Sequence, residues 1–317
     1  MELNGKKVLV TGSAGFIGST LSEKLLEKGC IVIGFDNFND YYQGKKDNVS
    51  TLIKNKDFSL VNDDMLNFNQ LSNAMKNIDI VFHLAAQPGI RFSLEHPIIT
   101  NRINTEGMLN VLEAAKKNNV KKVVNASSSS VYGNPNYTPV DEDHPLQPIS
   151  IYGVSKLAAE KYCLIYSKLY DFDVVSLRYH TVYGPRGRPD MAIFKWVNSL
   201  FNNKPIILYG DGNQTRDMTY VDDIVNGTIR ASITENISGE VFNLASGRRV
   251  SMNFVLEQLS NLTHMNPEIN YEKPRIDDAK DTHGKIDKAK KILGYEPKTS
   301  IEDGLGLTVE WYKQNFK

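Results

Sequence analysis

Short runs of apolar, largely β-branched residues alternate with longer segments of helical periodicity over the first 180 residues of the chain. The apolar runs predict strands, and apolar residues that recur every three or four positions predict amphipathic helices between them. The predicted strands are residues 6–12, 30–36, 79–86, 120–128 and 173–179, and the predicted helices are 15–28, 100–118 and 152–170. Because these strands are apolar almost throughout, we expect a parallel sheet that helices cover on both faces.

The pattern changes after "VYGPRGRPD" to irregular segments rich in Gly, Pro and Asn, with isolated helical patterns at 191–203, 251–263 and 301–315. At 317 residues the chain is longer than a typical single domain. We therefore predict an α/β protein with a doubly wound parallel sheet over residues 1–180. A smaller C-terminal α/β domain over residues 181–317 would bind the substrate and return some segments to the first domain.

The chain holds 37 Lys and Arg against 37 Asp and Glu, so it has no net field that favours nucleic acid or an anionic membrane. The sequence contains no run of about 18 apolar residues, and its N-terminus lacks the apolar core of a signal peptide. Cys30 and Cys163 have no spaced partner, which favours buried, reduced thiols. We expect a soluble, cytoplasmic protein that binds neither nucleic acid nor membrane.

The stretch "VLVTGSAGFIG" places Gly12, Gly15 and Gly18 between the first predicted strand and a helix that starts near Phe16 and Ile17. Glycines at such a turn let backbone amides approach a pyrophosphate, and the helix N-terminus adds positive potential. The spacing is G-x-x-G-x-x-G, and its place at the first strand–helix turn predicts a Rossmann-like dinucleotide site.

Asp36 ends the second predicted strand. A carboxylate there accepts hydrogen bonds from the ribose hydroxyls of adenosine and repels a 2′-phosphate. We therefore predict NAD rather than NADP as the cofactor, although Lys45 and Lys46 lie downstream. Comparable affinity for NADP would contradict this choice.

Tyr152 and Lys156 lie four residues apart, so on a helix both project from one face. A tyrosine has a pKa near 10, and it acts as a base near neutral pH only if its phenolate is stabilised. A lysine one turn away and a cationic nicotinamide ring both have the required charge. The pair predicts a site for proton transfer behind the nucleotide-binding half.

Nearly the whole chain resembles an extended short-chain dehydrogenase/reductase, and within that family the sugar-nucleotide 4-epimerases. The resemblance rests on "TGSAGFIG", "HLAAQPGIRFS", "SSSSVYG", "YGVSK", "LRYHTVYGPRGRPDM" and "GDGNQTRDMTYVDDI". It implies that a tyrosine takes the O4 proton of a UDP-sugar while the C4 hydride passes to NAD. The 4-keto sugar then turns over, and hydride and proton return with inverted configuration.

The resemblance also implies roles for single residues. The hydroxyl that contacts the reacting sugar lies four positions before the tyrosine of V-Y-G, which selects Ser128 from Tyr132, and Tyr152 and Lys156 complete the catalytic group. At the cofactor, Asp64 is expected at the adenine amino group with Met65 beside it, and Ala85 at the strand end that faces NAD. Asn104 is expected to fix backbone geometry near the active site.

For the substrate, the resemblance places Arg216 and Arg275 at the diphosphate, where a planar guanidinium suits phosphate oxygens. Arg91 is expected to approach the sugar or the diphosphate. Ser129, Ser130 and Thr181 could present hydroxyls to a carboxylate at C5 of the sugar, and the string around Thr181 is closest to glucuronate 4-epimerases. Arg186 and Arg188 are expected at a hinge rather than at the sugar.

The identity of the sugar stays open at this point. The small Thr282 stands where galactose-specific enzymes carry a bulky tyrosine, which leaves room for an N-acetyl group. The predicted substrates are therefore UDP-glucuronate or UDP-N-acetylglucosamine, with UDP-glucose as a further option.

Other readings of the same framework are a UDP-glucuronate decarboxylase, a sugar-nucleotide dehydratase and a protein that senses NAD without turnover. The first two would place carboxylates beside the catalytic hydroxyl, where this chain has Ser129 and Ser130. A sensor would typically lose the tyrosine or the lysine, and both are present. The histidines lack ligand spacing, so we expect no metal.

The helices predicted around 104–118 and 152–170 are apolar over much of their circumference. Such a helix has to be covered on all sides, and the sheet covers only one. We expect a partner subunit to cover the other, giving a homodimer joined by a helical bundle.

Overall fold

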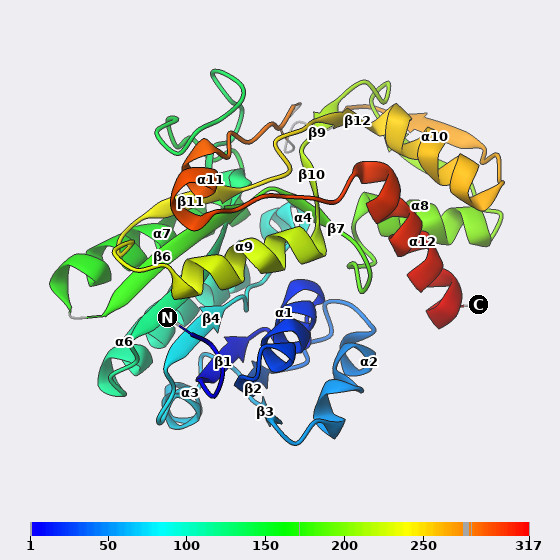
Figure 1. Cartoon of the computed structure of the whole chain (residues 1–317). Helices are drawn as coiled ribbons and strands as arrows, with labels where there is room; N and C mark the ends of the chain where they lie inside the picture. The colour runs from blue at the N-terminus through cyan, green and yellow to red at the C-terminus, as the bar shows by residue number, and fades with distance from the viewer. Residues whose placement is uncertain (1, 171, 275–278, 280, 317) are drawn as a thin grey trace.

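The computed structural model describes residues 2–170, 172–274, 279 and 281–316 (Figure 1). Its centre is a seven-stranded parallel sheet in the order β11-β6-β5-β4-β1-β2-β3. These strands are β1 (Lys7–Thr11), β2 (Ile31–Asp36), β3 (Phe58–Asn62), β4 (Ile80–His83), β5 (Lys122–Ser128), β6 (Asp173–Tyr179) and β11 (Val241–Leu244). The predicted doubly wound α/β fold is confirmed.

Side chains alternate between the two faces of β1, and each set packs on a different group of helices. Val8 and Val10 share a hydrophobic cluster with α1, whereas Leu9 belongs to the cluster under α3, α6 and α7. Figure 1 shows α1 and α9 side by side on one face of the sheet. The helices of these layers are α1 (Phe16–Glu27), α2 (Lys45–Val49), α3 (Phe68–Ala74), α6 (Gly107–Lys117), α7 (Ile151–Leu169) and α9 (Val221–Ile233).

Beyond residue 180 the chain builds a smaller unit, in which α8, α10 and α12 lie close together (Figure 1). Its elements are β7 (Thr181–Tyr183), α8 (Ala192–Phe201), β8 (Ile206–Tyr209), β9 (Thr215–Arg216), β10 (Met218–Tyr220), β12 (Val250–Ser251), α10 (Met252–Thr263), β13 (Ile269–Glu272), α11 (Asp287–Leu293) and α12 (Ile301–Phe316). From the same half, α9 and β11 join the central sheet and its covering helices. The division at residues 180 and 181 remains a prediction.

The segment predicted as one helix over 100–118 is helical without a break over residues 97–117, but it contains a π-helical turn that was not predicted. The chain forms α4 (Ile90–Glu95), α5 (Pro97–Asn101) and then a π-helical turn, Arg102–Glu106, before α6. Within this turn Asn104 is buried, and its amide bonds the backbone N–H and C=O of Gln87 at 2.7 and 3.1 Å. The wider turn thus aims a side-chain amide at the loop after β4.

The strand order reverses between β1 and β4, because the chain leaves β1 for β2 and β3 on one side and returns to β4 on the other. In open parallel sheets, a crevice for ligands forms at the carboxyl ends of the strands beside such a reversal. The carboxyl ends of β1, β2 and β5 carry the glycine turn, Asp36 and the four serines, respectively.

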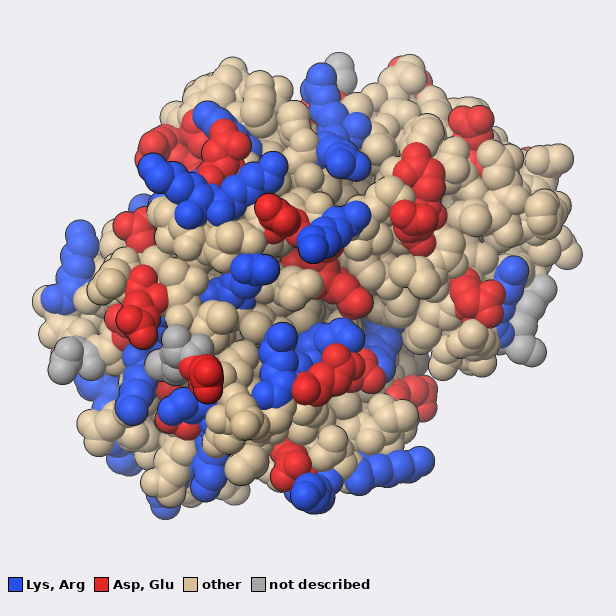
Figure 2. All heavy atoms as spheres, viewed as in Figure 1, with Lys and Arg blue, Asp and Glu red and all other residues tan. Residues whose placement is uncertain are grey.

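Lys and Arg side chains are interspersed with Asp and Glu on the face drawn in Figure 2, as the balanced composition predicts. Within the described ranges, no helix is both long enough and apolar enough to cross a membrane.

Candidate active site

One cavity of about 2260 Å³ opens along the carboxyl ends of the strands and continues between the sheet and the smaller unit. Most of the residues predicted for the site contribute to its wall; Asn104 and Thr282 do not, and Arg275 lies outside the described residues. Those in the wall are Gly12, Gly15, Phe16, Ile17, Gly18, Asp36, Asp64, Met65, Ala85, Arg91, Ser128, Ser129, Ser130, Tyr152, Lys156, Thr181 and Arg216. The fold therefore brings residues from both halves of the sequence to one space.

The glycine turn has no room for side chains. A Cβ atom on Gly18 would lie 2.0 Å from the carbonyl oxygen of Gly12, and one on Gly12 would lie 2.8 Å from the amide nitrogen of Ala85. Gly12 also has a φ of +72°, a conformation that favours glycine. This close approach of backbone to backbone leaves the start of α1 open to the cavity, so the turn fits a pyrophosphate.

The carboxylate of Asp36 is held rigidly at the end of β2. It accepts hydrogen bonds from the amides of Ala14 and Phe38 at 3.0 and 2.9 Å, and its side chain is buried. Burial raises the pKa of Asp36 despite these bonds. Asp64 is fixed in a similar way, because it accepts bonds from Asn37 and from the amide of Leu66 at 2.8 Å each. Both carboxylates line the nucleotide end of the cavity and fit an adenosine.

Adjacent serines at the end of β5 face different surroundings. The hydroxyl of Ser127 donates to the buried carboxylate of Glu160 at 2.9 Å. The hydroxyl of Ser128 instead bonds Ser130 and Tyr152. Of the pair, it is Ser128 that reaches the predicted base.

Tyr152 and Lys156 lie one turn apart on α7, and both line the cavity. Burial raises the pKa of Tyr152, while the charge of Arg188 and the hydrogen bond with Ser128 act to lower it. Burial also lowers the pKa of Lys156 to about 8. The lysine is therefore close to losing its proton at a pH where the tyrosine is still protonated, and further positive charge is needed to favour the phenolate.

The buried charge of Lys156 should cost stability. Because its pKa falls from 10.5 in the unfolded chain to about 8, the folded state is penalised by about 3 kcal/mol below pH 8. We expect Lys156→Met to raise the free energy of unfolding of the nucleotide-free protein at pH 7, and to lose this advantage as pH rises from 8 toward 10.5. Denaturation with urea across this pH range measures it, and a variant less stable than the parent at pH 7 would contradict it.

The predicted substrate residues differ in their surroundings. Arg91 lies at the rim with a side chain 69% exposed, and it pairs with Glu95 at 3.4 Å. Arg216 lines the cavity from β9 and donates to the carbonyl of Thr215 at 2.9 Å. Thr181 begins β7, and it lines the cavity together with Ser129 and Ser130. The polar wall at the sugar end is thus formed by Thr181 of β7 and by the two serines that follow β5.

The expectation that Arg186 and Arg188 both lie at a hinge was wrong for Arg188. Arg186, with a φ of +64°, pairs with Glu23 of α1 at 3.0 Å and does not line the cavity. Two residues later, Arg188 lines the cavity and its charge acts on Tyr152. The only sequence signal for this difference was the glycine between the two arginines.

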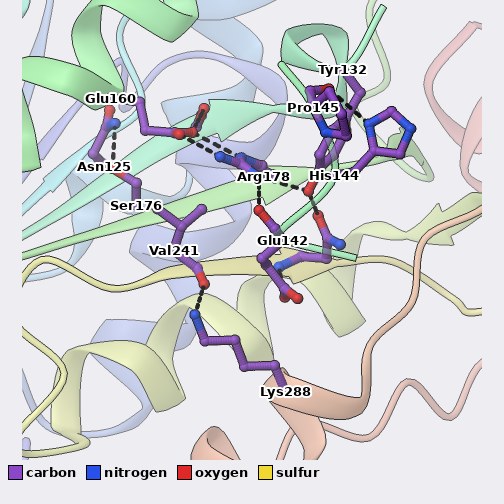
Figure 3. Close-up of polar contacts among 12 residues, drawn as sticks. Asn125, Tyr132, Glu142, His144, Pro145, Glu160, Ser176, Arg178, Val241 and Lys288 are labelled. Atoms are coloured by element: carbon purple, nitrogen blue, oxygen red, sulfur yellow. Dashed lines mark hydrogen bonds and ion pairs between the residues drawn. The ribbon is translucent and has the colours of Figure 1, made fainter. Parts of the chain in front are cut away.

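A buried polar network lies behind the serine turn (Figure 3). Arg178 of β6 donates two hydrogen bonds to Glu160 of α7, at 3.0 and 2.6 Å, and a third to the hydroxyl of Tyr132 at 2.8 Å. That hydroxyl donates to Asn243 of β11 at 2.8 Å. The tyrosine of V-Y-G is therefore anchored to the sheet, and this fixes the turn that carries Ser128.

A nucleotide cradle and a tyrosine–lysine pair that open into one cavity are what a short-chain dehydrogenase/reductase needs in order to oxidise and reduce a hydroxyl. The protein is of this class, in its extended form, and its cofactor is NAD. Residues 8–245 match the NAD dependent epimerase/dehydratase family, and the chain belongs to that family.

Several relatives with similar sequences or structures are nucleotide-sugar 4-epimerases. A UDP-glucuronate 4-epimerase of Thermodesulfobacterium geofontis is 42% identical, over 98% of this chain and 97% of its own. The structure of a UDP-glucuronic acid 4-epimerase from Bacillus cereus with UDP-glucuronic acid and NAD superimposes with a TM-score of 0.93 at 38% identity, over 98% of this chain and 100% of that one. A UDP-N-acetylglucosamine 4-epimerase from Methanobrevibacter ruminantium, solved with UDP-N-acetylmuramic acid, has a TM-score of 0.93 at 30% identity, over 99% of this chain and 100% of that one.

Proposed function

We propose UDP-glucuronate as the preferred substrate of this NAD-dependent UDP-sugar 4-epimerase, with UDP-galacturonate, its C4 epimer, as the product. The observation that carries the choice is Arg188, which lines the cavity and whose charge acts on the predicted base, Tyr152. A guanidinium pairs with a carboxylate far better than hydroxyls alone do. Together with Thr181, Ser129 and Ser130 it would hold the C5 carboxylate. The UDP-glucuronate 4-epimerases of Thermodesulfobacterium geofontis and Bacillus cereus support this choice.

The residues of the chain would carry the proton transfers of the reaction. As a phenolate, Tyr152 takes the proton of the sugar O4, with Ser128 bonded to both oxygens, and Lys156 stabilises the negative charge. When bound, NAD supplies the hydride acceptor beside the sugar and a positively charged ring. After the 4-keto sugar has turned its other face to the ring, Tyr152 returns the proton and the configuration at C4 is inverted.

UDP-N-acetylglucosamine is the second candidate, because the cavity has a neighbour of about 140 Å³. Thr282 lines this smaller space together with Ser130 and Arg216. A small residue at Thr282 leaves volume beside the sugar for an acetamido group. The relative from Methanobrevibacter ruminantium supports this alternative.

The proposal predicts that Arg188→Met raises the KM for UDP-glucuronate about 100-fold, because a charged, bidentate contact is lost, and leaves the KM for UDP-glucose within a factor of about three. The matched control is Arg186→Met, which removes an arginine that pairs with Glu23 and does not line the cavity. Purified protein is incubated with each UDP-sugar, and the C4 epimers are quantified. A parent enzyme that prefers UDP-N-acetylglucosamine, or an Arg188→Met variant that weakens both sugars equally, would overturn the choice of uronate.

The same incubation separates the competing reactions. Release of CO2 with formation of a UDP-pentose would identify a decarboxylase, and a 4-keto-6-deoxy sugar would identify a dehydratase. Either product in place of a C4 epimer would contradict the proposed function.

We also propose a homodimer that forms through the outer side of α7. Val154, Ile165 and Leu169 expose 53%, 48% and 66% of their surface there, and Ile98 of α5 exposes 78%. Apolar exposure of this extent along one helix marks a surface that another chain covers.

The expected mass by light scattering at micromolar concentration is that of two chains. Leu169→Glu should yield monomers, whereas Ile53→Glu, at an equally exposed position (57%) before β3, should not; a monomeric parent protein would contradict the proposal.

A cytoplasmic location is likewise proposed. It is supported by two free cysteines that are both buried, and disulfides are rare in reducing compartments.

A further inference from the structure

The segment between β2 and α2, residues 37–44, contacts both ends of the cavity, and we refer to it as the 37–44 loop. At the cofactor end, the hydroxyl of Tyr42 accepts a hydrogen bond of 3.2 Å from the amide of Phe16, in the first turn of α1. At the sugar end, the neighbouring Tyr41 donates to the carboxylate of Asp190 at 3.0 Å. Two adjacent tyrosines thus reach two different subsites.

Asp190 in turn holds Arg188. Its two carboxylate oxygens accept hydrogen bonds from Nε and Nη2 of the guanidinium at 2.9 Å each. This paired geometry fixes the plane of the guanidinium and uses one of its edges. The Nη1 edge faces away from Asp190 and is available to a ligand in the cavity, which Arg188 lines.

The position of Tyr41 is determined on several sides. Its ring packs edge-to-face on Phe92 of α4 with centroids 5.2 Å apart, and the Arg188 guanidinium lies 6.0 Å above it. Gly89 leaves space for its hydroxyl, since a Cβ there would lie 2.3 Å from that oxygen. Burial raises the pKa of Tyr41 to about 12, so the hydroxyl keeps its proton and donates at neutral pH.

We propose that Tyr41 is a positioning residue for substrate specificity, which orients Arg188 through Asp190 for the carboxylate of a UDP-uronate. This inference rests on the proposed function. Without the hydroxyl of Tyr41, Asp190 is free to follow the guanidinium or to turn its negative charge toward the sugar, and both changes weaken the binding of an anionic group. The binding of a sugar with an uncharged C6 would not change.

The charges of Arg188 and Asp190 explain why Tyr41 is needed to hold Asp190 in place. Burial alone would raise the pKa of Asp190, but hydrogen bonds from Arg188 and Tyr41 hold it below its ordinary value. Asp190 is therefore an anion that neutralises Arg188 and would repel a second carboxylate at close range. Holding it on the far edge of the guanidinium lets Arg188 bind the substrate while its own partner stays in place.

The test is Tyr41→Phe, which keeps the ring on Phe92 and removes only the hydroxyl. We expect the KM for UDP-glucuronate to rise about five- to tenfold with kcat within a factor of two. The inhibition constants of UDP and UDP-glucose, which lack the carboxylate, should stay within a factor of two. The matched control is Tyr42→Phe, whose effect should fall on NAD affinity and leave the ratio of uronate KM to UDP inhibition constant unchanged.

Two results would overturn the inference: a KM and inhibition constants that rise together in Tyr41→Phe, which indicates a general structural role, or no change in either. Measuring Arg188→Met in the same experiment distinguishes failure of the inference about Tyr41 from failure of the proposed function. If Arg188→Met loses uronate preference while Tyr41→Phe does not, only the role of Tyr41 fails. If Arg188→Met keeps the preference, the proposed function fails first.

Discussion

Tyr152→Phe is expected to lower kcat about 10³-fold while NAD and UDP-glucuronate still bind. The ring stays in place on α7, but the oxygen that exchanges a proton with the sugar O4 is lost, and positioned acid–base groups typically contribute 10²–10⁴-fold. We therefore expect a loss in kcat rather than in KM, measured by the rate of C4 epimer formation at saturating substrate.

The matched control for this change is Tyr166→Phe. Tyr166 lies on the same helix, donates to Glu113 at 2.5 Å and does not line the cavity. Its loss should leave kcat within a factor of two. Near-normal turnover by Tyr152→Phe would remove the proposed base, and an equal loss in both variants would point to a disturbed helix instead.

The parts of the site that the sequence could predict are those built from nearby residues. The glycine turn and the Tyr152–Lys156 pair each lie within one turn or one helix, so their spacing in the sequence determines how the residues lie relative to one another. Ser128 needed a family resemblance, because the four serines have the same side chain. The folded chain gives the physical difference, because Ser127 is bonded to Glu160 and Ser128 to Tyr152.

The parts that escaped prediction depend on contacts between distant segments. Tyr41 and Asp190 are 149 residues apart, and nothing in "DNFNDYYQ" or "GPRGRPDM" states that they meet. The π-helical turn was missed for a related reason. Its periodicity is that of a helix, and the hydrogen bonds of Asn104 within it are made with Gln87 on another segment. Likewise β11 is a short run of four residues, three of them apolar, which becomes a sheet strand only by pairing with the edge of β6.

The network behind the serines should carry a large share of the stability of the fold. Arg178 and Glu160 are each only 3% exposed, so neither charge can return to water if the other is removed. We expect Arg178→Met to lower the free energy of unfolding by about 3–5 kcal/mol, since it leaves a buried, unpaired carboxylate. Arg102→Met is the matched control, because its ion pair with Glu106 is 62% and 51% exposed and such pairs contribute about 0–1 kcal/mol.

A double variant distinguishes an unpaired charge from lost packing. Arg178→Met/Glu160→Gln removes both charges and should recover more than half of the loss at pH 7, because no buried carboxylate is then left without its partner. Urea denaturation of the parent and the two variants measures this. A deficit that the double variant does not relieve would mean that packing, rather than the pairing of Arg178 with Glu160, holds α7 on the sheet.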